Sequence, residues 1–232
     1  MFELGDAGQL KLFMSKEHRF GTDSLLLGEF ARNVKNKVVV DLCSGCGIIP
    51  LLLLNRESKN QARKIVAVEI QQEAADLLRH TVAENALAHL IEVVQGDLKS
   101  AEVLMQIGRE TVDLVTANPP YYSQNSGFER DSKSQKTARY EHGDESGCAG
   151  CTLVDVVKAA EYLLKFGGEL KMCMTAPRLC ECIAAMQSCS IEPKEIMLIP
   201  AKKSNTARLF LISGKKGGKS GINVCWKQQA GS

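Results

Sequence analysis

The chain has 232 residues, of which 44% are hydrophobic and 24% are charged, and its formal net charge is +2. This composition is that of an ordinary globular protein and excludes collagen-like, fibrous and intrinsically disordered classes. The longest apolar run, residues 48–54, is far shorter than the ~20 residues of a membrane-spanning helix. The amino terminus lacks the features of a secretory signal, so we expect a cytoplasmic protein whose cysteines stay reduced.

Short apolar segments alternate with helical patterns, which is typical of strands buried on both faces of a parallel sheet. The helical pattern is clearest in residues 71–85. Two later apolar segments, 194–200 and 208–213, flank a short polar stretch and predict an antiparallel hairpin. We therefore expect one α/β domain over residues 1–232, with a Rossmann-like, doubly wound, mostly parallel seven-stranded sheet closed by that hairpin. The five predicted parallel strands are residues 37–42, 64–70, 91–96, 112–117 and 168–174.

Three regions lie outside the alternating core pattern. Residues 1–36 form an amino-terminal extension, and residues 122–151, which lack apolar periodicity, predict a substrate loop. Residues 194–232 contain the hairpin and a basic tail, with seven Lys or Arg and no acidic residue from position 200 onward. Such a positive patch attracts polyanions by releasing their counterions. A solvated, lysine-rich hairpin without a ligand is the alternative interpretation.

The first predicted strand runs into a glycine loop, Asp41-Leu-Cys-Ser-Gly-Cys-Gly47. Glycines at the carboxyl edge of a parallel sheet let the backbone approach a ligand, although a turn without a ligand also needs them. An NAD fingerprint would require Gly or Ala where this chain has Pro50. The carboxylate of Asp41 would repel a pyrophosphate but attract an ammonium and a sulfonium. The loop therefore predicts S-adenosylmethionine as the cofactor.

Two further acids follow the next two strands. Glu69 stands where an acid accepts hydrogen bonds from both ribose hydroxyls. Asp97 would accept from the adenine amino group while the Leu98 amide faces a ring nitrogen; the alternative is that Asp97 caps a helix. Three acids at three successive strand ends favour an adenosine-containing cofactor. The residues assigned to it are Asp41, Ser44, Gly45, Gly47, Glu69, Ile70, Asp97, Leu98 and Asn118.

The fourth strand ends in Asn118-Pro119-Pro120-Tyr121, which we assign as the catalytic residues. The two prolines fix two φ angles and remove two amide donors, so this turn presents acceptors. The side-chain oxygen of Asn118 and the carbonyl of Pro119 would accept from a planar amino group and direct its lone pair toward a methyl group. Tyr121 would stack on a flat substrate. An ordinary proline turn is the alternative interpretation.

Together, these motifs resemble those of class I S-adenosylmethionine-dependent amino-methyltransferases. Residues 20–28 (FGTDSLLLG), 118–122 (NPPYY) and 138–141 (ARYE) are similar to segments of bacterial valine-tRNA adenine N6-methyltransferases, which modify the base beside the anticodon. This resemblance implies methyl transfer to the exocyclic amino group of adenine in RNA, in particular tRNA. It also implies that Thr22 and Asp23 lie over the cofactor. Cys43 replaces the first loop glycine of many members, and we expect that its backbone does not need a positive φ.

Contacts to RNA are expected from the basic tail and from the loop that would close over a flipped base. Two alternatives remain: a protein-glutamine N5-methyltransferase, which also needs acceptors around a planar amide, and an RNA-binding protein that keeps the fold without turnover. The residues assigned to RNA are Arg130, Arg139, Lys202, Lys203, Arg208, Lys215, Lys216 and Lys219.

Two C-x-x-C pairs, at residues 43–46 and 148–151, superficially suggest a zinc site. The first pair occupies the turn assigned to the cofactor, and its thiols would have to leave that turn to reach a metal. We therefore expect no metal ion.

Overall fold

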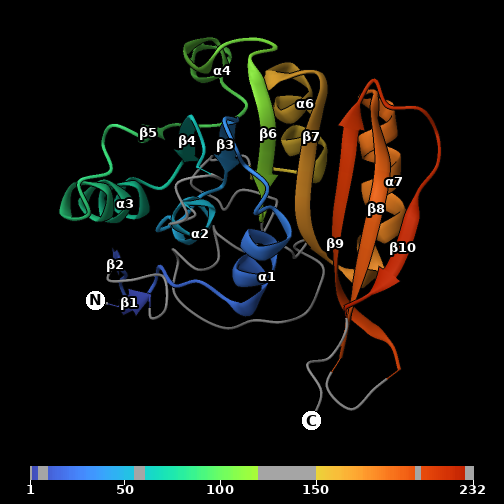
Figure 1. The fold of residues 1–232 in the computed structure, drawn as a ribbon, viewed down its shortest axis with the longest axis horizontal. Coiled ribbons are helices and arrows are strands. Elements are labelled where there is room, and N and C mark those ends of the chain that lie inside the picture. Colours follow the sequence, from blue (N-terminus) through green and yellow to red (C-terminus); the bar gives the residue numbers. More distant parts are fainter. Residues whose placement is uncertain (1, 5–9, 55–60, 120–149, 202–204, 228–232) are drawn as a thin grey trace.

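The structure is a computed structural model that describes residues 2–4, 10–54, 61–119, 150–201 and 205–227 (Figure 1). In chain order the elements are β1 (Phe2–Leu4), β2 (Leu10–Leu12), α1 (Thr22–Phe30), β3 (Val38–Leu42), α2 (Ile48–Leu53), β4 (Lys64–Glu69), α3 (Gln72–Glu84), β5 (Ile91–Gln95), α4 (Ala101–Ile107), β6 (Val112–Ala117), α6 (Leu153–Leu163), β7 (Leu164–Thr175), α7 (Leu179–Ser188), β8 (Ile191–Pro200), β9 (Ala207–Lys216) and β10 (Asn223–Trp226). From β3 to β8 in this chain, strands alternate with helices.

The main sheet of the described residues has the strand order β10-β8-β9-β7-β6-β3-β4-β5. The strands from β7 to β5 in this order all run parallel; at its centre, Val40 of β3 pairs with Val66 of β4 and Val115 of β6. Strand β9 runs antiparallel to both β7 and β8. The predicted doubly wound, mostly parallel α/β sheet with a closing antiparallel hairpin is therefore confirmed.

The described sheet has eight strands rather than the predicted seven, because β10 adds a strand at its edge. This strand pairs in parallel with β8, with Val224 opposite Ile196 and Trp226 opposite Leu198. All four residues of β10 are exposed. A short edge strand of this kind has no alternation of buried and exposed residues, which is the signal that identifies a strand in a sequence.

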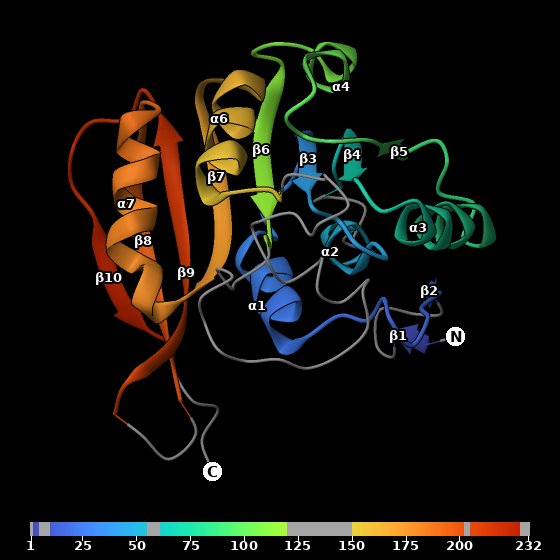
Figure 2. The same cartoon turned by 180° about the vertical axis from the view of Figure 1, so that it is seen from behind.

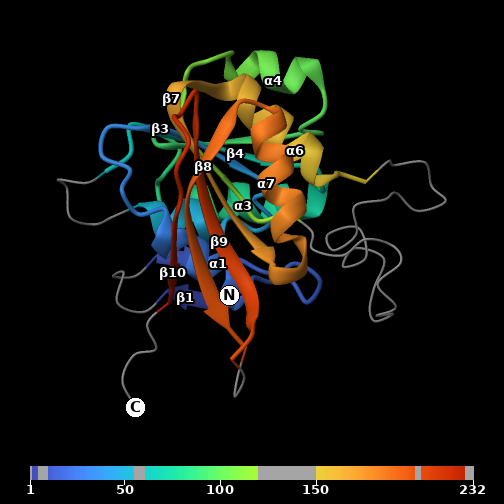
Figure 3. The ribbon, with the colours of Figure 1, turned by 90° about the vertical axis from the view of Figure 1, so that its right-hand side faces the viewer.

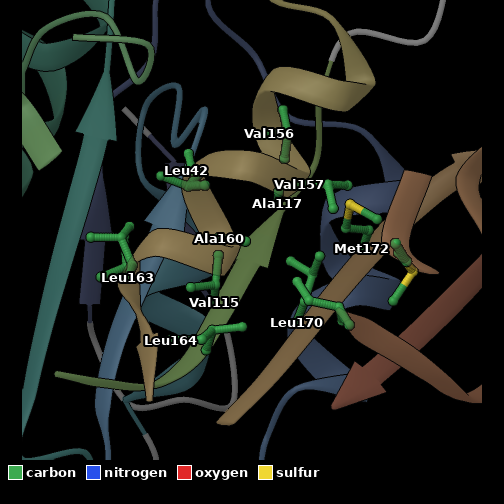
Figure 4. Packing of buried hydrophobic residues seen from close by; sticks show 14 of the residues in the cluster. Leu42, Val115, Ala117, Val156, Val157, Ala160, Leu163, Leu164, Leu170 and Met172 are labelled. Carbon is green, nitrogen blue, oxygen red and sulfur yellow. The ribbon is translucent and has the colours of Figure 1, made fainter. Parts of the chain in front are cut away.

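Different helices cover the two faces of the sheet. Helices α4, α6 and α7 pack on one face, and α1, α2 and α3 pack on the other. Figure 2 shows α6 and α7 in front of strands β7 to β9, and Figure 3 turns the same arrangement by 90°. In the close view of Figure 4, Val156, Val157 and Ala160 of α6 lie near Val115 of β6 and Leu170 of β7. Burial of apolar surface of this kind, at about 25 cal/mol per Å², is the main favourable contribution to folding.

Local sequence signals explain where two helices begin. Thr152 caps α6: its hydroxyl accepts from the Asp155 amide at 3.2 Å, and the Asp155 carboxylate accepts from the Thr152 amide at 3.0 Å. Ser100 caps α4 by accepting from the Val103 amide. Each cap satisfies amide donors that have no partner within the helix.

The carboxyl ends of β3, β4, β5 and β6 all lie at one edge of the sheet, because these strands are parallel. Figure 1 shows α1 beside the end of β6 at this edge. None of the helices in the described part of the chain is long and apolar enough to cross a membrane.

Candidate functional site

The loop between β3 and α2 is held by the neighbouring strand β4. The Ser44 amide donates to the carbonyl of Val68 at 3.0 Å, and the Gly45 amide donates to Oε2 of Glu69 at 2.8 Å. Both loop glycines have a positive φ, +55° at Gly45 and +92° at Gly47. A Cβ on Gly47 would lie 2.1 Å from the side chain of Leu78, whereas a Cβ on Gly45 would meet no atom of the described residues within 4 Å. Gly47 is thus required for packing, and Gly45 faces open space that a ligand can use.

The prediction for the backbone of Cys43 is wrong: its φ is +59°, in the left-handed region. For a non-glycine residue this conformation costs roughly 1–2 kcal/mol, which explains why a glycine suits this position. A side-chain hydrogen bond with Cys151, together with burial, raises the pKa of the Cys43 thiol well above its usual value. The thiol therefore stays neutral and packs as part of the protein interior.

Asp41 lies within β3 and is completely buried. Its Oδ1 accepts a 2.6 Å hydrogen bond from the Thr116 hydroxyl, while its Oδ2 has no hydrogen-bond partner in the described structure. Burial raises the pKa of Asp41 to about 7, against the opposing effect of hydrogen bonds from Thr116 and Ser44. A buried carboxylate oxygen without a partner is costly, and a cationic group arriving from the loop side would remove that cost.

Glu69 ends β4 and is 4% exposed. Its two carboxylate oxygens accept from the amides of Gly45 and Gln71, at 2.8 and 2.9 Å. Burial raises the pKa of Glu69, although these backbone hydrogen bonds oppose the shift. A carboxylate has about four acceptor positions, so Glu69 keeps some capacity for hydroxyl donors beyond these amides. Glu69 thus ties the glycine loop to β4 and keeps capacity to bind a diol.

Asp97 follows β5 and does not cap the next helix, because Ser100 has that role. Its Oδ1 accepts from the Lys99 amide at 2.9 Å, and its side chain is 36% exposed. Next to it, Leu98 is buried at 6% exposure. Ile70, after Glu69, is 45% exposed. Asp97 and Ile70 are thus accessible to a ligand at the strand edge.

Asn118 comes directly after β6, and its side-chain amide is held by the amino-terminal turn of α1. Its Nδ2 donates to the hydroxyl of Ser24 at 2.9 Å and to Oδ2 of Asp23 at 3.2 Å. Thr22, the first residue of α1, is exposed, and Pro119 is buried. The structure thus brings Asp23 and Asn118, both predicted from the sequence, into direct contact although they are 95 positions apart in the chain.

The carboxyl end of α1 is fixed as well. Lys171 of β7 donates from Nζ to the carbonyl of Phe30 at 2.9 Å and lies 4.8 Å from the centre of the Phe30 ring. Close packing of Gly28 against Leu52 of α2 adds a third restraint, since a Cβ on Gly28 would lie 2.6 Å from that side chain. Helix α1 is therefore a rigid support for Asn118.

The basic tail divides between the two ends of the sheet. Arg208 is exposed and precedes Leu209, which pairs with Thr175 at the carboxyl end of β7. Lys215 is exposed and pairs with Glu169, farther back along β7. Arg208 and Lys215 are seven positions apart on β9, about 24 Å at ~3.4 Å per residue. Lys219 follows at the end distant from Asn118, so it and Lys215 do not extend the surface near the glycine loop.

The position of Lys216 does not support its predicted contact with RNA. This residue is 8% exposed, and its Nζ lies 3.1 Å from Oε1 of Glu110 and 2.9 Å from Oε1 of Glu161. It also donates to the carbonyl of Glu161 at 2.6 Å. The alternation of side chains along β9 turns Lys216 inward, where its ammonium joins β9 to α6.

Several predicted residues lie outside the described residues. They include part of the catalytic tetrapeptide, most of the predicted substrate loop and two lysines of the basic tail. The residues concerned are Pro120, Tyr121, Arg130, Arg139, Lys202, Lys203 and positions 122–149 of the loop.

Two residues of the site were missed by the sequence reasoning, Thr116 and Ser24. Thr116 is a hydroxyl residue in an otherwise mostly apolar strand, and the register places it opposite Asp41. Ser24 is a small polar residue among leucines, with 6% exposure. Both are unusual polar residues in apolar surroundings, but their partners are far away in the sequence.

Comparison with known proteins finds a family model and similar sequences that match about half of this chain or more. Residues 9–132 match the model of the methyltransferase small domain family. A 125-residue segment is 37% identical to a tRNA1(Val) (adenine(37)-N6)-methyltransferase of Erwinia tasmaniensis, covering 54% of this chain and 48% of that relative. A 154-residue segment is 32% identical to the enzyme of the same name from Histophilus somni, covering 66% and 59%. The matches thus span only about half the length of these curated relatives.

A solved structure supports the fold. A predicted O-methyltransferase from Agrobacterium tumefaciens superposes with a TM-score of 0.64, covering 88% of this chain and 85% of that one, at 22% identity. At 22% identity, this similarity shows only that the two proteins share an arrangement of helices and strands.

Proposed function

We propose that this chain, which belongs to the methyltransferase small domain family, methylates the exocyclic amino group of adenine in RNA, specifically in tRNA near the anticodon, with S-adenosylmethionine as methyl donor. The observation that carries the proposal is the position of Asn118 at the end of β6, on the sheet edge that also holds Asp41 and Glu69. The names of the two curated relatives support the substrate. The enzyme would act in the cytoplasm.

The residues at this edge fit S-adenosylmethionine. Within the described part of the chain, Oδ2 of Asp41 lacks a partner and Gly45 faces open space, and Glu69 retains acceptor capacity for the ribose hydroxyls. Asp97 and Leu98, after the next strand, would hold the adenine. When bound, this cofactor supplies an electrophilic methyl group on a sulfonium, whose positive charge suits a site with three carboxylates.

Asn118 and Pro119 would bind the amino group of the target base. Such a group is a poor nucleophile because its lone pair is delocalised into the ring. If Oδ1 of Asn118 and the carbonyl of Pro119 each accept one N–H, the nitrogen is held in the geometry in which its lone pair leaves the ring plane. The nitrogen becomes cationic as it reacts and then readily loses a proton, so these two residues need to position and polarise rather than deprotonate. Tyr121, which lies outside the described residues, is proposed to stack on the base.

RNA would approach the carboxyl edge of the sheet. Among the described residues of the basic tail, Arg208 is exposed at this edge, and Lys227 also lies there with its ammonium 2.9 Å from Oε2 of Glu29. The proposed RNA surface also includes four residues that are assigned to it from the sequence only. They are Lys202 and Lys203 of the basic tail, and Arg130 and Arg139 of the predicted substrate loop. Phosphate contacts by such residues would position the tRNA, and base recognition would take place at Asn118.

The proposal is tested by incubating the purified protein with methyl-labelled S-adenosylmethionine and unmodified tRNA transcripts, followed by nucleoside analysis. Label in N6-methyladenosine is expected. Label in the glutamine of a protein added in parallel, with none in RNA, would instead establish the protein-glutamine N5-methyltransferase. Binding of tRNA without label in any acceptor would favour the RNA-binding protein without turnover.

A further inference from the structure

The orientation of the Asn118 carboxamide is determined by two acceptors on α1. Its amide nitrogen donates to Ser24 Oγ at 2.9 Å and to Asp23 Oδ2 at 3.2 Å. The nitrogen and oxygen ends of an asparagine are distinguished by their partners, and a carboxylate accepts hydrogen bonds only. Rotating the amide by half a turn would bring Oδ1 against the carboxylate oxygen, which is repulsive. The amide nitrogen therefore faces α1, and Oδ1 is directed the other way.

Ser24 is the more strongly constrained of these two acceptors. Its side chain is buried at 6% exposure, so water does not readily replace it as a partner of Asn118. It lies within the amino-terminal turn of α1, whose other end is held by Lys171. The position of the hydroxyl relative to β6 is thus set by helix packing rather than by a flexible loop.

We propose that Ser24 is a positioning residue, whose hydroxyl, together with Asp23, holds the Asn118 carboxamide so that Oδ1 accepts from the amino group of the substrate. The inference rests on the proposed function of Asn118. The last torsion of an asparagine side chain is broad and roughly two-fold, so loss of the shorter of these two hydrogen bonds weakens the preference for this orientation. In the opposite orientation, the amide donors of Asn118 would oppose the amino group of the base.

The role is tested with Ser24→Ala. Alanine is the most favourable helix residue, so this variant keeps α1 while deleting the acceptor. We expect kcat to fall about 10- to 100-fold, as is typical when a reacting group is misplaced. The dissociation constant for S-adenosylmethionine should stay within about twofold of the wild type, because the cofactor acids are unchanged. If the kcat of the Ser24→Ala variant equals that of the wild type, the proposal is overturned.

Leu26→Ala is the matched control on the same helix. Leu26 is partly buried against the core, and its side chain has no polar group that could hydrogen-bond to Asn118. We expect it to lower the melting temperature while leaving kcat unchanged well below that temperature. If both variants lose kcat only in proportion to their loss of folded protein, Ser24 has a merely structural role and the inference fails.

A second measurement does not depend on activity. In protein labelled with ¹⁵N-asparagine, the Asn118 side-chain signal is assigned by its loss in Asn118→Ala. Its amide hydrogens should exchange with solvent at least tenfold faster in Ser24→Ala than in the wild type; equal rates would contradict the inference. A wild-type protein that methylates neither RNA nor protein would overturn the proposed function, and the exchange rates would still decide whether Ser24 holds Asn118.

Discussion

The Thr116 hydroxyl donates a 2.6 Å hydrogen bond to Oδ1 of Asp41, and both side chains are completely buried on the neighbouring strands β6 and β3. This hydrogen bond partly offsets the burial that raises the pKa of Asp41 to about 7. The negative charge of the nearby Glu69 acts in the same direction as burial. The proposed cofactor acid is thus only partly ionised near neutral pH.

Affinity for S-adenosylmethionine should therefore rise with pH. With a pKa of about 7, Asp41 is about one-tenth ionised at pH 6 and about nine-tenths ionised at pH 8, so the dissociation constant should fall about tenfold over this range. Calorimetric titration at pH 6, 7 and 8 measures the effect. Asp41→Asn should bind more weakly and with little pH dependence. Affinity of the wild type that does not vary with pH would contradict the assignment.

The same shift predicts how stability depends on pH. The folded chain holds the Asp41 proton more tightly than the unfolded chain, because its pKa is raised from 3.8 to about 7. The contribution of this group to the free energy of unfolding therefore decreases as the pH rises through that interval. Denaturant unfolding of the wild type, relative to Asp41→Asn, should show this decrease.

Thr116→Val is the sharper test of the hydrogen bond itself. Deleting the donor removes a hydrogen bond that lowers the pKa of Asp41. The midpoint of the rise in S-adenosylmethionine affinity with pH should therefore move upward from about 7. A midpoint that moves downward would show that Thr116 does not stabilise the ionised carboxylate.

Asn118→Ala should separate chemistry from cofactor binding. Removing a preorganised group that acts on the reacting atoms typically lowers kcat by about 10²–10³. The dissociation constant for S-adenosylmethionine should change little, since Asp41 and Glu69 remain. Single-turnover methylation and equilibrium binding measure the two effects. Full activity of the variant would rule out the assigned role.

Arg208 and Lys215 form a matched pair for the RNA surface. Both are exposed basic residues of β9, but only Arg208 lies at the carboxyl edge of the sheet. Arg208→Ala should weaken tRNA binding and reduce the slope of log affinity against log salt by about 1. Lys215→Ala should leave both nearly unchanged. Equal losses in the two variants would mean that RNA covers both ends of the sheet.

Lys216 should matter for stability and not for RNA. Lys216→Met removes its contacts with Glu110 and with the side chain and carbonyl of Glu161. We expect a loss of about 1–3 kcal/mol in the free energy of unfolding, measured with urea, because a buried hydrogen-bonded charge is removed. Affinity for tRNA should not change. A stability equal to that of the wild type would show that the ion pairs of the buried Lys216 contribute nothing net.

The amino-acid sequence by itself determined the alternation of strands and helices, the acids at successive strand ends and the position of Asn118 after the fourth predicted strand. The spacing of apolar residues and the residue types that form turns are local properties, so they can be recognised in short segments of sequence. The resemblance added the methyltransferase family, which the match of residues 9–132 confirms.

Only the tertiary structure decided which distant residues meet. The contact of Ser24 with Asn118 and the register of Thr116 opposite Asp41 depend on helix packing and strand pairing across long stretches of chain. The same is true of the burial of Lys216, which a count of basic residues treats as equivalent to Lys215. Charge and composition along a chain do not specify which face of a strand is buried, and that face determines whether a lysine is available to RNA.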